Sequence, residues 1–344
     1  MDIRRVQMTG GSSFIVTLPK EWAESVGLKK NDPLRLSPQQ DGSIIITTAD
    51  SDTSSTYVTK TIDVQGLTDA DLIFRMLVGA YMSGFSLIEV ISASRLSNTV
   101  LDVVGKMTQM AIGIEIIEEY DDKIILKDLV DPSEMKMGKS VERMRVLVRN
   151  MLTDVVSALK ENDTSFINDI IARDGDVDRL GWLITRHTNM FQRDIGLLKR
   201  IGMDHSEITS NYTISRIVER IGDHAVLMSK NLRKIVGHDG QKDLRNEAAK
   251  LCDATITLFA KSFATVSGSD PKAASDCVNE CRDLSEITKN LNKYAQGKDP
   301  DVSLSINLMT SSLRRICEYS MDLAELAINL IMGKSEKRVV KKVS

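Results

Sequence analysis

The sequence predicts a multidomain protein with a strand-rich N-terminal unit, a small α+β connector and a C-terminal all-α bundle. Three observations predict this order. The period of the apolar residues changes from that of strands to that of helices, a polar segment at residues 49–57 separates the first two parts, and 344 residues are too many for one ordinary core. We place the domains at residues 1–48, 57–131 and 138–333, followed by a basic tail at residues 334–344.

Composition and charge narrow the possible functions. The 45 basic and 48 acidic residues give a net charge of −3, which neither requires nor excludes a nucleic-acid partner. Aromatic residues make up 4% of the chain, which argues against stacking platforms for single-stranded nucleic acid. No apolar run reaches the roughly 18 residues of a membrane span, and the N-terminus lacks the apolar core of a signal peptide. We therefore expect a cytoplasmic protein.

The first 48 residues alternate between apolar and polar positions, as short strands do. The pattern predicts four strands, around residues 3–6, 14–18, 34–36 and 44–48. A short helix begins at Pro19, whose fixed φ suits a first turn, and ends at Gly27, because glycine adopts a positive φ without strain. So few elements bury little surface, and we expect the unit to need a second copy of itself.

The stretch "RRVQMTGGSSFIVTLPKEW" and the turn "GLKKND" make residues 4–48 similar to the AbrB-type (SpoVT-AbrB) DNA-binding domain. In that family, two chains interlace their hairpins into one swapped-hairpin β-barrel. The resemblance implies that basic residues of the paired N-terminal strands and loops face DNA. By position these DNA-facing residues are Arg4, Arg5, Lys20, Lys29 and Lys30. The alternative is a dimerisation module that does not bind DNA.

The connector alternates strands with helices in the order β-α-β-α-β-β. We expect strands at residues 57–64, 87–92, 114–119 and 123–126, and helices at residues 69–83 and 98–110. An order and size of this kind predict a small ferredoxin-like sandwich. The segment shows no catalytic or metal-ligand spacing, so we expect a connector, a second dimerisation unit or a ligand-sensing unit.

From about Val141 the apolar residues follow a helical period of 3.6. Breaks rich in glycine, aspartate and proline divide this part into six helices, at residues 141–161, 164–196, 205–236, 241–266, 271–296 and 302–332. Six helices in two sets of three indicate an internal duplication, with repeats at about residues 138–237 and 240–333.

The third and sixth helices carry the same pair of carboxylates. The segments "RIVERIGDHAVLMSKN" and "RICEYSMDLAELAIN" align without gaps, so that Glu219 matches Glu318 and Asp223 matches Asp322. A spacing of four residues places both carboxylates of a pair on one helix face, where they repel each other. Solvent and nearby arginines could compensate this charge. Alternatively a cation does so, and oxygen ligands from neighbouring helices suit Mg, Mn, Fe or Ca.

The second helix has the same spacing at Asp174 and Asp178, and "ERIGDHA" follows in the third. On these motifs, residues 138–333 resemble the PhoU family, which couples phosphate transport to phosphate-responsive gene control. The resemblance implies divalent or trivalent metal ions (Fe, Zn, Mn or Mg) on E/D-x-x-x-D motifs. By position the ligands are Asp174, Asp178, Glu219, Asp223, Glu318 and Asp322, with Glu280 and Asp283 in the fifth helix. Leu284 takes the fourth place after Glu280, so the second set is incomplete.

Together the two resemblances imply a phosphate-responsive transcriptional regulator, of a kind expected in archaea. It would form a homodimer or higher oligomer and bind DNA. The alternative is a PhoU-like adaptor that does not bind DNA and regulates a phosphate or other anion transporter by contact with its subunits.

An enzyme is the less favoured class. Di-metal oxidases use a Glu-x-x-His signature, and the candidate spacing here, Glu207 with Ser210, lacks the histidine. The sequence has no Ser-His-Asp grouping, phosphate-binding glycine loop or Rossmann fingerprint. We therefore expect no catalytic activity.

Overall fold

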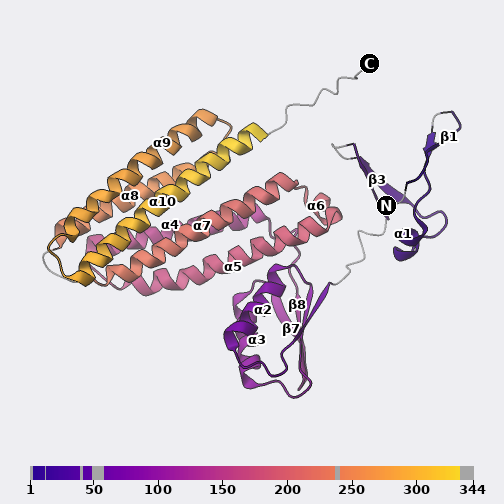
Figure 1. The fold of residues 1–344 in the computed structure, drawn as a ribbon, viewed down its shortest axis with the longest axis horizontal. Helices are drawn as coiled ribbons and strands as arrows, with labels where there is room; N and C mark the ends of the chain where they lie inside the picture. Colours follow the sequence, from indigo (N-terminus) through magenta and orange to yellow (C-terminus); the bar gives the residue numbers. More distant parts are fainter. Residues whose placement is uncertain (1–2, 12, 39–41, 49–57, 237–240, 334–344) are drawn as a thin grey trace. The chain divides into compact units, whose positions relative to one another are not determined.

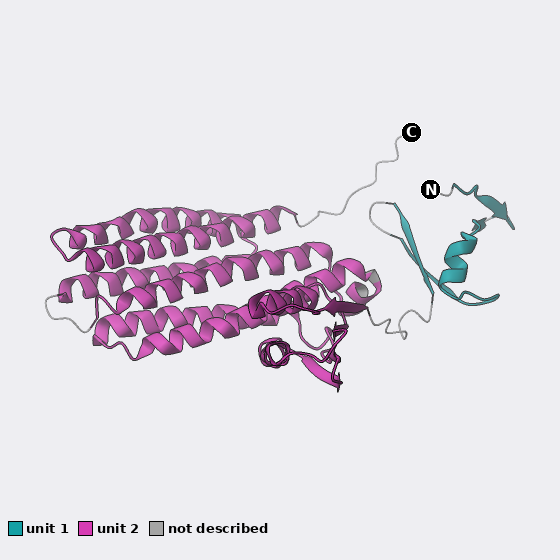
Figure 2. Ribbon diagram, turned by 60° about the horizontal axis from the view of Figure 1, so that its bottom comes forward, with its two compact units in different colours: residues 1–57 teal, residues 58–344 magenta. Residues whose placement is uncertain are grey.

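The computed structural model divides the chain into two units, Met1–Tyr57 and Val58–Ser344 (Figures 1 and 2). It describes residues 3–11, 13–38, 42–48, 58–236 and 241–333. The predicted linker at residues 49–57 and the predicted basic tail at residues 334–344 lie outside the described residues.

The N-terminal unit consists of two antiparallel hairpins and one short helix. Strands β1 (Gln7–Thr9) and β2 (Ser13–Ile15) pair first, α1 (Lys20–Ser25) follows, and β3 (Leu34–Pro38) pairs with β4 (Ile44–Thr48). The first strand was expected around residues 3–6 and lies later, because Gly10 and Gly11 have φ of 64° and 79° and turn the chain there. Gly27 follows α1 with φ 66°, as predicted.

None of the described side chains in this N-terminal unit is buried. Phe14 exposes 76% of its surface, Leu36 60% and Ile44 57%. Large apolar side chains that remain in contact with water on so small a unit favour pairing with another chain. The unit as described has no core of its own, so the expectation of a dimer stays a prediction with this observation in its support.

The connector is a four-stranded sheet that packs two helices against one face (Figure 1). In chain order it comprises β5 (Thr59–Asp63), α2 (Ala70–Met82), β6 (Leu87–Ile91), α3 (Asn98–Met110), β7 (Ile114–Glu119) and β8 (Lys123–Asp128). Buried Ile62, Val90 and Ile124 lie opposite one another on neighbouring strands and belong to the core beneath the helices.

The strand order of the connector refines the sequence-based expectation. The sheet runs β5-β6-β8-β7, with β5 and β6 parallel and the other neighbours antiparallel. A ferredoxin-like sandwich has the chain order β-α-β-β-α-β. The connector has the two-layer α/β architecture that was predicted. Its chain order is β-α-β-α-β-β, in which the last two strands form a hairpin, so it does not have the ferredoxin-like order.

The C-terminal part is a bundle of six long helices in two sets of three. They are α4 (Met137–Glu161), α5 (Phe166–Arg193), α7 (His205–Leu232), α8 (Lys242–Val266), α9 (Pro271–Thr288) and α10 (Pro300–Gly333). Within each set the three helices pack on one another, and the sets meet through α4 on α8 and α7 on α10. One continuous core of buried side chains spans both sets. The six helices in two sets of three that the sequence predicts are present. Their origin by duplication stays a prediction.

Three bundle helices end earlier than the sequence predicts, and α7 is one of them, since it ends at Leu232 and not at residue 236. The predicted helix 164–196 stops at Arg193, because Asp194 has an extended backbone and its carboxylate accepts a hydrogen bond from Leu197 N, in the short helix α6 (Ile195–Ile201). The predicted helix 271–296 changes after Thr288 into a 3-10 helix, η2 (Lys289–Ala295). Periodicity does not distinguish these tighter turns from a continuous helix.

A buried arginine joins the connector to the bundle. Arg186 on α5 exposes 1% of its side chain, and its Nη2 and Nε donate to Asp128 Oδ2 at 2.6 and 3.0 Å. Its guanidinium also donates to the carbonyls of Tyr81 at 2.6 Å and Phe85 at 2.9 Å. One turn further along α5, Asn189 donates to the last carbonyl of α2 at 2.7 Å. These bonds fix the connector on the bundle helix that carries Asp174 and Asp178.

We expect Arg186→Met to lower the free energy of unfolding by about 3–5 kcal/mol, because it leaves the buried carboxylate of Asp128 without its partner. Arg186→Lys keeps the charge, but it cannot reach all three acceptors and should also destabilise. Urea unfolding measures both. The matched control is Arg143→Met on the exposed surface of α4, expected within about 0.5 kcal/mol of the parent. Equal stability of the Arg186 and Arg143 variants would show that this junction does not depend on the arginine.

Candidate metal centre

Four carboxylates approach one another where α5 packs antiparallel to α7 (Figure 1). They are Asp174 and Asp178 on α5 and Glu219 and Asp223 on α7. Each pair is one helical turn apart on one face, as the sequence spacing predicts. Glu219 lies against the position of Gly181 on α5, and Asp174 lies against the position of Gly222 on α7, so carboxylates of the two helices are neighbours. The structure therefore brings together these four predicted site residues.

Two glycines in the helix interiors lie beside these carboxylates. A Cβ added to Gly181 of α5 would lie 3.1 Å from Glu219 Oε2 of α7. A Cβ added to Gly222 of α7 would lie 3.9 Å from Asp174 Oδ1 of α5 and 3.3 Å from Val148. Each helix thus presents a glycine to a carboxylate of the other helix. Sequence reasoning missed both, although glycine inside a helix costs about 1 kcal/mol relative to alanine and so indicates a close contact.

Burial and mutual repulsion weaken the acidity of the cluster. The pKa of Asp178 is raised to about 7. Loss of hydration is the largest cause of this rise, and repulsion by the other three carboxylates contributes the rest. Burial, followed by the charge of Asp223, raises the pKa of Asp174 above its ordinary value. The pKa of Glu219 is raised by burial even though Arg216 forms an ion pair with it.

The cluster supplies oxygen donors and excess negative charge, which a hard cation such as Mg²⁺, Mn²⁺ or an iron ion neutralises. In the part of the chain that the structure describes, no three His, Cys, Asp or Glu side chains are arranged as ligands of one ion. The donor types suit a hard cation, but their arrangement as described does not form a site for one. Binding would require these carboxylates to turn about their side-chain bonds toward the ion.

The second repeat does not reproduce this arrangement. Glu318 and Asp322 lie one turn apart on α10, but Glu318 forms ion pairs with Arg314 at 3.3 Å and Arg315 at 2.9 Å. Burial raises the pKa of Asp322, with smaller contributions from Glu325 and Glu318.

The α9 pair lies in different surroundings. Glu280 forms an ion pair with Lys261 of α8 at 2.5 Å, and Asp283 is exposed. Neither contributes to the shifted pKa of Asp322 on α10. The acidic pair on α9 and the acidic pair on α10 therefore do not form one cluster. This agrees with the incomplete spacing at Leu284 in the sequence.

One arginine lies between the two repeats. The Arg220 guanidinium of α7 lies 5.8 Å from the ring centroid of Tyr319 on α10, and its charge acts to lower the pKa of both Asp223 and Asp322. His224 Nδ1 lies 3.3 Å from Ser312 Oγ of α10. Burial lowers the pKa of His224, while the neighbouring charge of Asp223 acts to raise it. The charge of His224 in turn acts to lower the pKa of Asp223.

The five predicted DNA-facing residues are exposed in the N-terminal unit. They are Arg4, Arg5, Lys20, Lys29 and Lys30. The Lys20 ammonium lies 3.6 Å from Glu24 Oε1, and the backbone N–H of Lys29 donates to Asp32 at 2.7 Å, which fixes the turn before β3. Their contact with DNA stays a prediction. No described helix combines the length and apolar character that crossing a membrane requires.

We expect Asp178→Asn to stabilise the protein at pH 8 and not at pH 4. In the folded protein Asp178 keeps its proton up to a pKa of about 7, whereas in the unfolded chain it ionises near 3.8. The folded state therefore binds more protons between these values, and the free energy of unfolding falls as the pH rises through that range. After a discount for solvent screening, the gain at pH 8 should be about 1–2 kcal/mol.

Urea unfolding at both pH values, with a chelator present, measures this difference. The control is Asp176→Asn on the same helix, whose carboxylate lies 3.6 Å from Arg179 at the surface. We expect this control to remain within about 0.5 kcal/mol of the parent. A difference between Asp178→Asn and the parent that is independent of pH would contradict the raised pKa.

Two family models match the chain. The PhoU domain model matches residues 141–232, which is the first three-helix repeat, and the model described as "Antidote-toxin recognition MazE, bacterial antitoxin" matches residues 7–54. No curated protein matches the chain.

Solved structures resemble the helical part. PhoU from Pseudomonas aeruginosa is 19% identical, with a TM-score of 0.50, over 57% of this chain and 96% of that chain. The phosphate transport system regulatory protein PhoU from Streptococcus pneumoniae is 16% identical, with a TM-score of 0.48, over 58% of this chain and 94% of that chain. Residues 141–232 of the bundle thus match the PhoU domain, and residues 7–54, which precede them in the chain, match a MazE-type antitoxin domain.

Proposed function

We propose that this protein is a phosphate-responsive transcriptional regulator that binds DNA as a dimer and holds a metal ion on its PhoU-like bundle. The observation on which the proposal depends is the cluster of four carboxylates between α5 and α7, in the same chain as a domain of the MazE and AbrB type. The phosphate response rests on the PhoU domain match, and DNA binding rests on the N-terminal match.

The proposed metal ligands are Asp174, Asp178, Glu219 and Asp223. When bound, a metal ion supplies positive charge that offsets the repulsion between α5 and α7. Desolvated carboxylates with raised pKa values gain most from such a partner, because both burial and like charge disfavour their ionised form. Protons compete for the same oxygens, so metal affinity should fall as the pH is lowered.

The connector offers a physical route from the bundle to the N-terminal domain. The helix that carries Asp174 and Asp178 also carries Arg186, which is bonded to Asp128, Tyr81 and Phe85 of the connector. A change in the packing of α5 against α7 therefore reaches the connector directly. The connector in turn follows the N-terminal domain in the chain, and we propose that it transmits the state of the cluster to DNA binding.

The second candidate function is an adaptor that regulates a phosphate or other anion transporter by protein contact. The observation in its favour is the weak charge of residues 1–48, which contain six basic and five acidic residues. Electrostatic affinity for phosphate groups would then be modest for each subunit. Neither candidate is an enzyme.

Metal binding predicts a thermal response that depends on the α7 carboxylates. After treatment with a chelator, added Mn²⁺ at 100 times its dissociation constant should stabilise the parent by about 2.7 kcal/mol and raise its melting temperature by several degrees. Glu219→Gln combined with Asp223→Asn removes two ligands and should abolish this rise. Glu280→Gln combined with Asp283→Asn is the charge-matched control on α9 and should respond as the parent does. An unchanged response in the α7 variant would refute the assignment.

DNA binding predicts a change in salt dependence. Replacement of Arg4, Arg5 and Lys29 by alanine should weaken binding to all sequences. It should also flatten the plot of log affinity against log salt by about 0.9 for each lost phosphate contact in each subunit. Replacement of three bundle lysines by alanine, at Lys242, Lys250 and Lys272, provides the control. Equal slopes for the two triple variants in a fluorescence titration would assign the N-terminal domain to dimerisation only.

The proposal as a whole is tested by mapping genomic binding in the source cells, with and without phosphate limitation. A regulator should occupy sites upstream of transporter genes, and their occupancy should change with phosphate supply. An adaptor should leave no such sites and should co-purify with transporter subunits. The second outcome would overturn the regulator and support the adaptor.

A further inference from the structure

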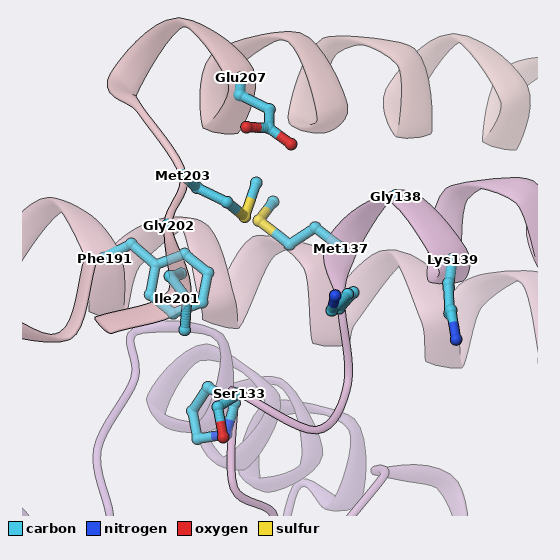
Figure 3. Close-up of a pocket in the computed structure, with 11 residues that line it drawn as sticks. Ser133, Met137, Gly138, Lys139, Phe191, Ile201, Gly202, Met203 and Glu207 are labelled. Carbon is cyan, nitrogen blue, oxygen red and sulfur yellow. The ribbon is translucent and has the colours of Figure 1, made fainter. Parts of the chain in front are cut away.

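A cavity of about 430 Å³ lies where the connector ends and the bundle begins (Figure 3). Its walls come from the segment after β8, the first turn of α4, the end of α5, the end of α6 with the loop after it, and the first turn of α7. Its volume lies within the range of roughly 300–1,000 Å³ that small-molecule sites occupy. None of the carboxylates proposed to hold metal lines it.

One wall of the cavity is apolar and adaptable. In Figure 3 the side chains of Met137 and Met203 point toward one another, and Phe191 and Ile201 lie together beside them. Met137 and Phe191 are buried, whereas Ile201 and Met203 are half-buried and form the accessible part of this wall. Thioether side chains adjust their shape to an apolar guest.

The remaining lining is polar and carries more positive than negative charge. Lys136 and Lys139 line the cavity at the start of α4. Glu207 of α7 also lines it, with its carboxylate directed toward the methionines (Figure 3). Lys136 is the residue before α4, and the N-terminal end of that helix adds a partial positive charge to that of the two lysines.

We propose that this cavity binds a small amphipathic anion, with one carboxylate or phosphate group on an aliphatic or aromatic body. Lys136 and Lys139 take the anionic group, and the apolar body lies on Ile201 and Met203. Glu207 accepts a hydrogen bond from a hydroxyl or amine on the ligand. Inorganic phosphate has no apolar surface for this wall, so the site differs in chemistry from one that senses phosphate itself.

A ligand in this cavity would touch both ends of the α5–α6–α7 connection and the segment that leads from the connector into α4. It would therefore contact the C-terminal end of α5 and the N-terminal end of α7, several turns away from the carboxylate cluster on the same two helices. The inference goes beyond the proposed function and does not rest on it, because occupancy of the cavity requires neither metal nor DNA.

Methionine methyl groups provide a direct test on the full-length protein. The chain contains 16 methionines, and labelling them with ¹³C-methyl groups allows Met137 and Met203 to be assigned by substitution with leucine. We expect 4-phenylbutyrate to shift both resonances saturably. Met151, buried in the bundle core, and Met8, exposed in the N-terminal unit, should not move. Absence of a shift at Met137 and Met203, or an equal shift at Met8, would overturn the proposal.

The charge preference is tested with two analogues of the same body, 4-phenylbutan-1-ol and 4-phenylbutylamine. The acid should bind most tightly, and tighter binding of the amine would overturn the anion class. Lys136→Met combined with Lys139→Met should weaken the acid about fivefold and leave the alcohol unchanged. Lys242→Met combined with Lys272→Met is the matched control and should bind the acid as the parent does.

A filled-cavity variant tests the location. Ile201→Trp adds bulk to a half-buried wall, so it should preserve the fold and abolish binding of both the acid and the alcohol. Circular dichroism verifies that the variant is folded. Parental affinity in this folded variant would place the probe elsewhere and overturn the proposal.

Discussion

Repulsion among the four carboxylates of α5 and α7 is the constraint on which the bundle depends. Apolar packing holds these helices together, and the same packing removes water from their acidic edge. The cost is visible in the pKa of Asp178, which rises to about 7. The fold tolerates this arrangement because a large buried core on both sides of the pair holds the helices in contact. A cation or a proton that reaches this acidic cluster reduces the repulsion between its carboxylates and so stabilises the contact between α5 and α7.

Much of the fold follows from the sequence because periodicity records which face of an element is buried. Helix α3 and strand β7 lie at their expected residues, and the two sets of three helices appear where the 3.6-residue period begins. Other features leave no such record. The order of strands in the connector depends on pairing between distant segments, and the early end of α5 depends on the backbone of Asp194.

The sequence likewise predicts one part of the candidate site and not the other. A spacing of four residues on one helix is local, so the sequence identifies the pairs at Asp174 and Glu219. Their meeting depends on how two helices pack against each other, and Gly181 and Gly222 lie at that contact. The junction at Arg186 was not foreseen, because its partners lie about 60 to 100 residues away in the chain. A lone arginine in a helix carries no local sign that it will be buried.

The contact between Arg220 and Tyr319 has a consequence for symmetry. These two residues occupy equivalent positions of the two repeats, and they face each other where α7 packs on α10. Two identical three-helix chains related by a twofold axis would place the same residue on both sides, and two arginines there would repel. Covalent fusion of the repeats removes that restriction. The bundle pairs a cation with an aromatic ring where α7 meets α10. Such a pairing of equivalent positions is open only to a pseudo-symmetric molecule whose halves are free to diverge.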